Sequence, residues 1–215
     1  MTESLESIAK MIDHSLLHPT LTDQELIDGC LVAIKHKVAS VCIKPYAVPL
    51  AKEILAGSEV KVGTVIGFPH GSSKTEIKLK EARMALDDGA VELDMVVNIS
   101  QVLSGRWDYV RDDLRAVIEL THERGGKVKA IFENCYLNDP QKIRLCEICG
   151  ELRADWVKTS TGYGTSGSTL DDLRLMRRHA PAHVQVKASG GVRVLDLALA
   201  LRAVGVTRFG FTLTV

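Results

Sequence analysis

The sequence predicts an α/β fold, a closed (β/α)8 barrel of the TIM type. Short segments rich in Val, Ile and Ala alternate with amphipathic stretches, eight such segments occur, and one of them is echoed a single strand–helix unit later. The length of 215 residues lies at the short end of the range for such barrels. Because no linker or change of composition interrupts the alternation, we expect one domain, residues 1–215.

The expected elements follow one another in order. Strands are expected at 12–16, 40–44, 61–68, 91–98, 127–133, 154–159, 183–189 and 207–211. Helices are expected at 23–36, 49–54, 73–88, 107–123, 140–150, 170–179 and 194–203, with one extra helix before the first strand. Thr22, Ser73, Asp139 and Thr169 are the expected N-caps, because short oxygen-bearing side chains satisfy free N–H groups at a helix start.

The sequence after the eighth strand is too short for another helix. The chain reaches Val215 soon after residue 211, so we expect the helix of the eighth unit to be missing. The seam between the last and first strands then needs another cover. We expect either the N-terminal helix or a neighbouring subunit to provide it.

The composition excludes several classes of protein. The 27 basic and 27 acidic side chains cancel, which argues against binding to nucleic acid or to a membrane surface. No uncharged apolar run is long enough to cross a membrane, and the first ten residues have no apolar signal region. Five cysteines are an odd number for a disulfide framework. Together these features predict a cytoplasmic protein with reduced thiols.

The echoed segments place two lysines at equivalent points of neighbouring strands. Residues 157–162 read VKTSTG and residues 186–191 read VKASGG, so Lys158 and Lys187 fall late in their strands. Asp94 falls late in an earlier strand. Active sites of such barrels lie at the carboxyl ends of the strands. A buried structural ion network is the alternative interpretation.

Two adjacent lysines have a specific chemistry. Like charges about 4 Å apart repel by about 4 kcal/mol at an effective dielectric constant near 20, so one amine would be largely neutral at pH 7. A neutral lysine attacks carbonyl carbon. Lys158 and Lys187 would supply the nucleophile and the activating cation, and Asp94 would move protons. These residues predict a Schiff-base enzyme without a cofactor or metal.

At these positions the chain resembles the 2-deoxyribose-5-phosphate aldolases, a family of class I aldolases on (β/α)8 barrels. The similar motifs are IDHSLL (12–17), VCI (41–43), VIGFPHG (65–71), ELDMVVN (92–98), GRW (105–107) and the two lysine segments. The resemblance implies that Lys158 forms the Schiff base, that Lys187 activates it and that Asp94 relays protons. The implied reaction reversibly cleaves 2-deoxy-D-ribose 5-phosphate to D-glyceraldehyde 3-phosphate and acetaldehyde, in deoxyribonucleotide and carbohydrate catabolism. A homo-oligomer, either a dimer or a tetramer, is expected.

The remaining candidate residues concern substrate binding. Asp13 resembles the family's acidic residue near the substrate hydroxyls, with a cap or core ion pair as the alternative. By analogy Cys42 faces the barrel mouth, or else it is a buried apolar residue. Glu133 is either a site residue or the partner of a site lysine. Phosphate is expected at backbone N–H groups of Thr161, Gly162, Gly190 and Gly191, which otherwise form tight turns. Phe211 is bulkier than the family's turn after the eighth strand, and Thr212 is the candidate replacement hydroxyl.

Other motifs are weaker. Residues 162–167 match G-x-G-x-x-G but lack the acidic residue of a dinucleotide site. Cys146 and Cys149 form a single C-x-x-C pair, and Pro19 disrupts the helical spacing of His14 and His18, so neither pair predicts a metal site. A barrel that only binds ligands and a pyridoxal phosphate enzyme remain alternative functions.

Overall fold

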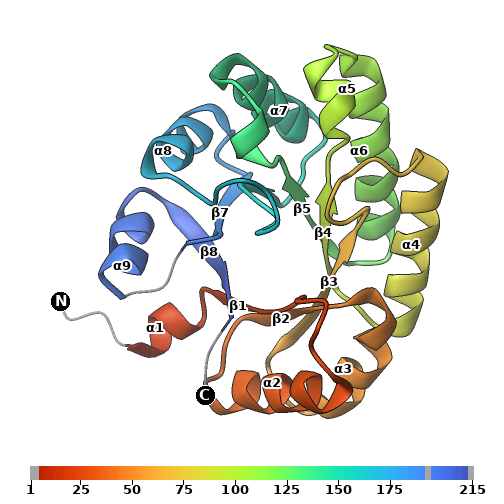
Figure 1. Ribbon diagram of the computed structural model, residues 1–215, viewed down its shortest axis with the longest axis vertical. Coiled ribbons are helices and arrows are strands. Elements are labelled where there is room, and N and C mark those ends of the chain that lie inside the picture. Colours follow the sequence, from red (N-terminus) through yellow and green to blue (C-terminus); the bar gives the residue numbers. More distant parts are fainter. Residues whose placement is uncertain (1–4, 192–194, 213–215) are drawn as a thin grey trace.

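The computed structural model describes residues 5–191 and 195–212, and its strands form the predicted closed barrel (Figure 1). Each strand pairs in parallel with the next, and β8 pairs with β1. The strands are β1 (Ile12–Leu16), β2 (Ser40–Ile43), β3 (Lys61–Ile66), β4 (Glu92–Val96), β5 (Lys127–Ile131), β6 (Trp156–Lys158), β7 (Gln185–Ser189) and β8 (Val206–Phe211). The fold prediction from the alternation is therefore confirmed.

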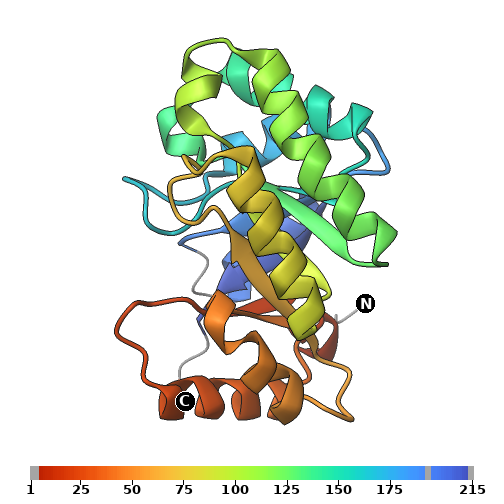
Figure 2. The same cartoon turned by 90° about the vertical axis from the view of Figure 1, so that its right-hand side faces the viewer.

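Helices surround the barrel, as Figure 2 shows for α4 and α6 along one side. They are α1 (Leu5–Ala9), α2 (Asp23–Lys35), α3 (Val48–Ile54), α4 (Thr75–Asp88), α5 (Ile99–Leu103), α6 (Trp107–Glu123), α7 (Asp139–Glu151), α8 (Leu170–His179) and α9 (Leu195–Ala203). Two single 3-10 turns, η1 (Pro45–Ala47) and η2 (Asn134–Tyr136), lie after β2 and β5. The seven predicted helices and the N-terminal helix are present, and α5 is an addition.

Several strands end earlier than predicted, because the chain turns over the barrel rim. The strand expected at 61–68 ends at Ile66, since Gly67 has a left-handed φ of 62°. The strand expected at 91–98 ends at Val96, since Asn98 caps α5 through its side chain. Apolar composition extends beyond both strands, so a pattern of hydrophobicity alone overestimated their length.

The helix caps were predicted half correctly. Thr22 caps α2 in a reciprocal capping box with Glu25, and Thr169 caps α8. Ser73 and Asp139 were wrong. The cap position of α4 is Lys74, which makes no side-chain cap bond. The cap of α7 is Asn138, one residue earlier than expected, because Asn138 and Gln141 form the second capping box.

The helix α1 lies beside the seam between β8 and β1, next to α9 in Figure 1. Ile8 of α1 is buried, and Arg202 of α9 donates a hydrogen bond to the hydroxyl of Ser7. Phe209 of β8 is fully buried and pairs with Ile12. These contacts support the expected cover by the N-terminal helix. The prediction that no helix follows β8 concerns residues 213–215, which lie outside the described residues.

The core has two parts, because each strand turns alternate side chains outward and inward. Outward side chains such as Leu93 and Met95 are fully buried beneath the helices. Inward side chains of several strands are charged and form the site. Within the described residues, none of the helices is sufficiently long and apolar to span a membrane.

Candidate active site

The two lysines and the aspartate predicted from the sequence meet inside the barrel. Lys158 and Lys187 are directly paired across β6 and β7. The Nζ atoms of both lysines lie 2.7 Å from the same atom, Oδ2 of Asp94 on β4. All three side chains are almost completely buried, with exposed fractions of 3%, 1% and 0%. The parallel register produces this meeting, since residues far apart in sequence point into one interior.

A second layer of charges lies against the first. Asp13 of β1 forms an ion pair with Lys187 at 2.5 Å, and the Ser40 hydroxyl donates a hydrogen bond to Asp13 at 2.8 Å. Lys129 of β5 lies 2.9 Å from Asp94 and 3.3 Å from Asp13. Asp13 is therefore an ion-pair partner of both Lys187 and Lys129.

The floor of the site is formed by residues that the sequence analysis did not select. Glu92 lies 2.6 Å from Lys129 and 2.8 Å from Arg208 of β8, which also pairs with Asp13. The Arg208 guanidinium lies over the Trp156 ring, 5.1 Å from its centre. The two lysines and the aspartate selected from the sequence are therefore part of a larger set of charges. The interior of the described barrel holds three acidic and four basic side chains: Asp13, Glu92 and Asp94 with Lys129, Lys158, Lys187 and Arg208.

The missed residues had a recognisable signal. Glu92 is two residues before Asp94 and shares its face, and Lys129 is the register partner of Asp94. Arg208 is the register partner of Lys187. Strand periodicity places each of them inward, but only the register between strands shows that they touch.

The two paired lysines have opposite electrostatic surroundings. Burial lowers the pKa of Lys158, and the positive charge of Lys187 lowers it further, against the opposing effect of Asp94. Burial would also lower the pKa of Lys187, but Asp13 and Asp94 outweigh it and raise that pKa. Lys158 is therefore the better candidate for a neutral amine. Repulsion by Lys187 contributes as expected, although burial has the larger effect.

The carboxylates remain ionised despite their burial. Burial would raise the pKa of Asp94, but Lys129, Lys158 and Lys187 hold it well below its ordinary value. Burial would likewise raise the pKa of Asp13, and Lys129, Lys187 and Arg208 lower it instead. An ionised carboxylate touching two ammonium groups can accept and return a proton without moving.

Cys42 lies in the same interior as the lysines. It is buried on β2, and its pKa is raised to about 11, chiefly by burial and also by the charge of Asp94. At neutral pH it is therefore a thiol.

Glu133 belongs to the loop above β5 and holds the loop above β6. It has a left-handed φ of 58° and is buried. Its carboxylate accepts hydrogen bonds from the backbone N–H of Thr161, at 3.2 Å, and from the Thr161 hydroxyl. The carboxylate of Glu133 is thus bound to Thr161. The alternative interpretation had expected it to pair with a site lysine.

The glycines proposed for phosphate form the turns above β6 and β7. Gly162, Gly190 and Gly191 have positive φ values of 93°, 80° and 89°. A side chain on Gly167 would approach the Gly190 carbonyl carbon to 2.6 Å, so the two loops lie against each other. The backbone therefore requires glycine here for its turns, whether or not a phosphate binds.

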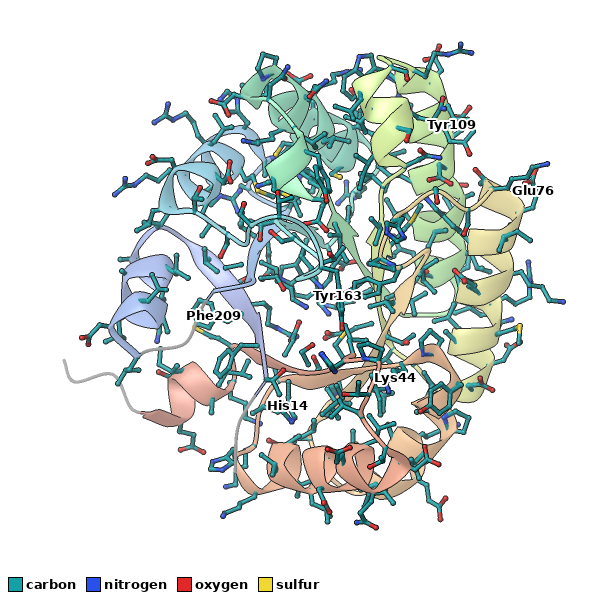
Figure 3. The ribbon with its side chains drawn as sticks, in the orientation of Figure 1. His14, Lys44, Glu76, Tyr109, Tyr163 and Phe209 are labelled. Carbon is teal, nitrogen blue, oxygen red and sulfur yellow. The ribbon has the colours of Figure 1, made fainter. Side chains whose placement is uncertain are left out.

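An aromatic pair lies over the barrel mouth. The rings of Tyr163, above β6, and Phe68, above β3, are 5.5 Å apart and perpendicular. Figure 3 shows Tyr163 above the centre of the barrel. Phe211 is partly buried, and the Thr212 hydroxyl donates to the Ser15 carbonyl at 3.1 Å.

The cysteine pair and the histidine pair lie outside the site. Cys146 and Cys149 are buried free thiols in α7. His14 is buried in β1, whereas His18 lies beyond that strand beside Thr20.

The site combines a buried amine of lowered pKa with an ionised carboxylate. These are the functional groups of an active site in which an amine attacks carbonyl carbon. The model of the DeoC/LacD family aldolase matches residues 7–211. A deoxyribose-phosphate aldolase of Rhodopirellula baltica is 60% identical over 96% of this chain and 86% of its own. One from Thermococcus gammatolerans is 49% identical over 94% and 91%. The chain belongs to the DeoC/LacD family of aldolases.

The solved structures agree with this assignment. A deoxyribose phosphate aldolase from Aeropyrum pernix, described as having a unique tetrameric structure, superposes with a TM-score of 0.91 at 30% identity. The alignment covers 97% of this chain and 88% of that one. The fold and the family assignment therefore rest on nearly the whole chain.

Proposed function

We propose that the protein is a class I aldolase that reversibly cleaves 2-deoxy-D-ribose 5-phosphate to D-glyceraldehyde 3-phosphate and acetaldehyde. The observation that carries the proposal is the contact of Lys158 and Lys187 with one oxygen of Asp94, each at 2.7 Å. The relatives that share the fold and much of the sequence are deoxyribose-phosphate aldolases, which supports the substrate.

Lys158 is the nucleophile of the proposed reaction. Its neutral amine attacks the aldehyde carbon of the open-chain sugar, and the carbinolamine loses water to give an iminium ion. The bond between carbons 2 and 3 then breaks as the hydroxyl on carbon 3 loses its proton. The electron pair of that bond enters the iminium and forms an enamine. Glyceraldehyde 3-phosphate leaves.

Protons return in the second half. The enamine takes a proton on its terminal carbon, and water then hydrolyses the iminium to release acetaldehyde and the free amine. Asp94 accepts and returns these protons, because it touches both Nζ atoms. Lys187 stays an ammonium between Asp13 and Asp94.

We propose that Thr161, Gly162, Gly190 and Gly191, in the loops above β6 and β7, form the phosphate site. The backbone N–H groups of the glycines would donate to the phosphate, whereas the N–H of Thr161 donates to Glu133. Glycine at three of these positions lets the main chain approach a ligand closely. Asp13 and the thiol of Cys42 line the interior beneath. We further propose a homo-oligomer, a dimer or tetramer, which sedimentation velocity would test.

Trapping the covalent intermediate tests the proposal. The protein is incubated with acetaldehyde and sodium borohydride, digested and mapped by mass spectrometry. We expect one ethyl group on Lys158 and loss of aldolase activity. The Lys158→Met variant should gain no ethyl group at this position. Lys78, which is buried elsewhere against Asp113, is the comparison within the same protein and should stay unmodified. An unmodified Lys158 in protein with native circular dichroism would refute the aldolase and favour a barrel that only binds ligands.

A further inference from the structure

Glu92, which is buried, and Arg208, whose side chain is 14% exposed, lie beneath the site and take no part in the steps proposed above. Arg208 Nη2 lies 2.8 Å from Oε1 of Glu92, and the guanidinium also pairs with Asp13. Glu92 Oε2 lies 2.6 Å from Lys129 Nζ. Through Asp13 and Lys129, these floor residues are joined to Asp94 and hence to Lys158.

The number of charges in this network is unequal if every group is ionised. The three carboxylates are Asp13, Glu92 and Asp94, and the four basic groups are Lys129, Lys158, Lys187 and Arg208. An uncompensated charge in a buried site is costly, and a group that can release its proton does so instead. One of the four basic groups is therefore expected to be neutral.

The contacts identify which group that is. An arginine does not lose its proton in a protein. Lys129 touches three carboxylates, at 2.6, 2.9 and 3.3 Å. Lys187 touches two, at 2.5 and 2.7 Å. Among the described residues Lys158 touches one carboxylate, Asp94, at 2.7 Å. Its proton is held by the fewest negative charges.

We propose that Arg208 and Glu92 are positioning residues that set the charge state of Lys158. Arg208, Lys129 and Lys187 balance the three carboxylates, so the network is neutral only when Lys158 is a free amine. The chemical use of that amine rests on the proposed aldolase function.

The other groups that face this region do not change the count. Cys42, on β2, is a thiol whose pKa burial raises to about 11, so it is uncharged near neutral pH. Glu133, above β5, directs its carboxylate to Thr161. Lys127 is exposed at the start of β5, and its Nζ atom lies 5.3 Å from the centre of the Trp156 ring.

Removing one charge of each sign gives opposite expectations. Arg208→Met leaves one negative charge in excess, so Lys158 should hold its proton to higher pH. Removing a unit charge on the order of 10 Å away, at an effective dielectric constant near 20, should raise the pKa of Lys158 by about one unit. We therefore expect roughly tenfold lower activity at pH 7, with recovery at alkaline pH. Glu92→Gln should move the acidic limb of the pH profile to lower pH. The double variant Arg208→Met with Glu92→Gln should return it towards the wild type.

The protonation of Lys158 can be measured without turnover. Competitive acetylation with acetic anhydride across a pH series, followed by peptide mass spectrometry, reports the titration of each lysine. Lys127→Met is the matched control, because Lys127 stacks on the same Trp156 ring but belongs to no ion pair of this network. It should leave the titration of Lys158 unchanged.

The opposite shifts and their cancellation support the proposal. It is overturned if Arg208→Met or Glu92→Gln leaves the titration of Lys158 unchanged, or if both shift it in one direction. Either single variant suffices if the other does not fold. Absence of an acetaldehyde adduct in the wild type would refute the proposed function instead, and the acetylation data would still decide the charge proposal.

Discussion

Lys158 and Lys187 are identical side chains on paired strands, and their neighbours make them chemically different. Lys187 lies between Asp13 and Asp94. Burial would lower its pKa, but the two carboxylates outweigh burial and raise the pKa above its ordinary value. Lys158 touches Asp94 and has a lowered pKa, chiefly because it is buried. The echoed sequence segments predicted the pairing of these lysines. The segments could not reveal the different partners of the two lysines, because Asp13 comes from a strand at the other end of the chain.

Lys187→Leu tests the division of roles. Loss of this ammonium removes a positive charge beside Lys158, so Lys158 should protonate more readily and activity at pH 7 should fall by about 100-fold or more. Steady-state rates across a pH series measure this. The variant also leaves Asp13 and Asp94 with fewer partners, which should cost about 3–5 kcal/mol of stability. Full activity at pH 7 would contradict the paired-lysine mechanism.

At the scale of elements, the ends of strands and helices decide where the side chains lie. Periodicity predicted the presence and order of the strands, but the rim of the barrel ends β3 and β4 earlier than hydrophobicity suggested. A pattern of residues also does not distinguish a true helix cap from a nearby serine. Thr22 precedes one predicted helix and Ser73 begins another, and only Thr22 makes the cap bond.

Thr22→Ala therefore should lower the free energy of unfolding by about 1 kcal/mol, since the N–H of Glu25 loses its acceptor and the capping box opens. Urea denaturation measures the change. Ser73→Ala is the comparison and should stay within about 0.5 kcal/mol of the wild type. Equal losses in the two variants would contradict the assigned caps.

The loop above β6 depends on a contact with the loop above β5. Thr161→Val removes the hydroxyl that Glu133 accepts from and leaves a buried carboxylate with fewer donors. We expect a loss of about 1–3 kcal/mol in stability and a higher KM for the phosphorylated sugar, because this loop carries part of the proposed phosphate site. Thr161→Ser keeps the hydroxyl and should retain both properties. A raised KM in the serine variant would assign the effect to the methyl group instead.

At the scale of the whole molecule, the barrel closes through β8 and β1, and His14 lies in that seam. It is buried, pairs in register with Phe211, and has a pKa lowered to about 4, chiefly by burial. The ordinary value is 6.5. A folded-state pKa below the unfolded one stabilises the fold above pH 6.5, and this contribution is lost as the pH falls towards 4.

His14→Gln should remove this pH dependence. In the wild type we expect stability to fall by about 3 kcal/mol between pH 6.5 and pH 4 from this residue. Denaturant midpoints at several pH values measure it, and the variant should lose less over that interval. Asp13 and Asp94 lose their stabilising effect in more acidic solution than this interval, because their pKa values are lowered from an ordinary value of 3.8. Equal slopes in both proteins would show that His14 is not responsible.

The sequence by itself determined the strand–helix alternation, the parallel barrel and the inward placement of Lys158, Lys187 and Asp94, because strand periodicity and repeat spacing are local properties. Only the tertiary structure decided that Lys129, Glu92 and Arg208 complete a buried network, and that Glu133 holds Thr161. Ion pairs depend on the distance between atoms of different strands, and that distance follows from the register and closure of the barrel. No spacing along the chain specifies it.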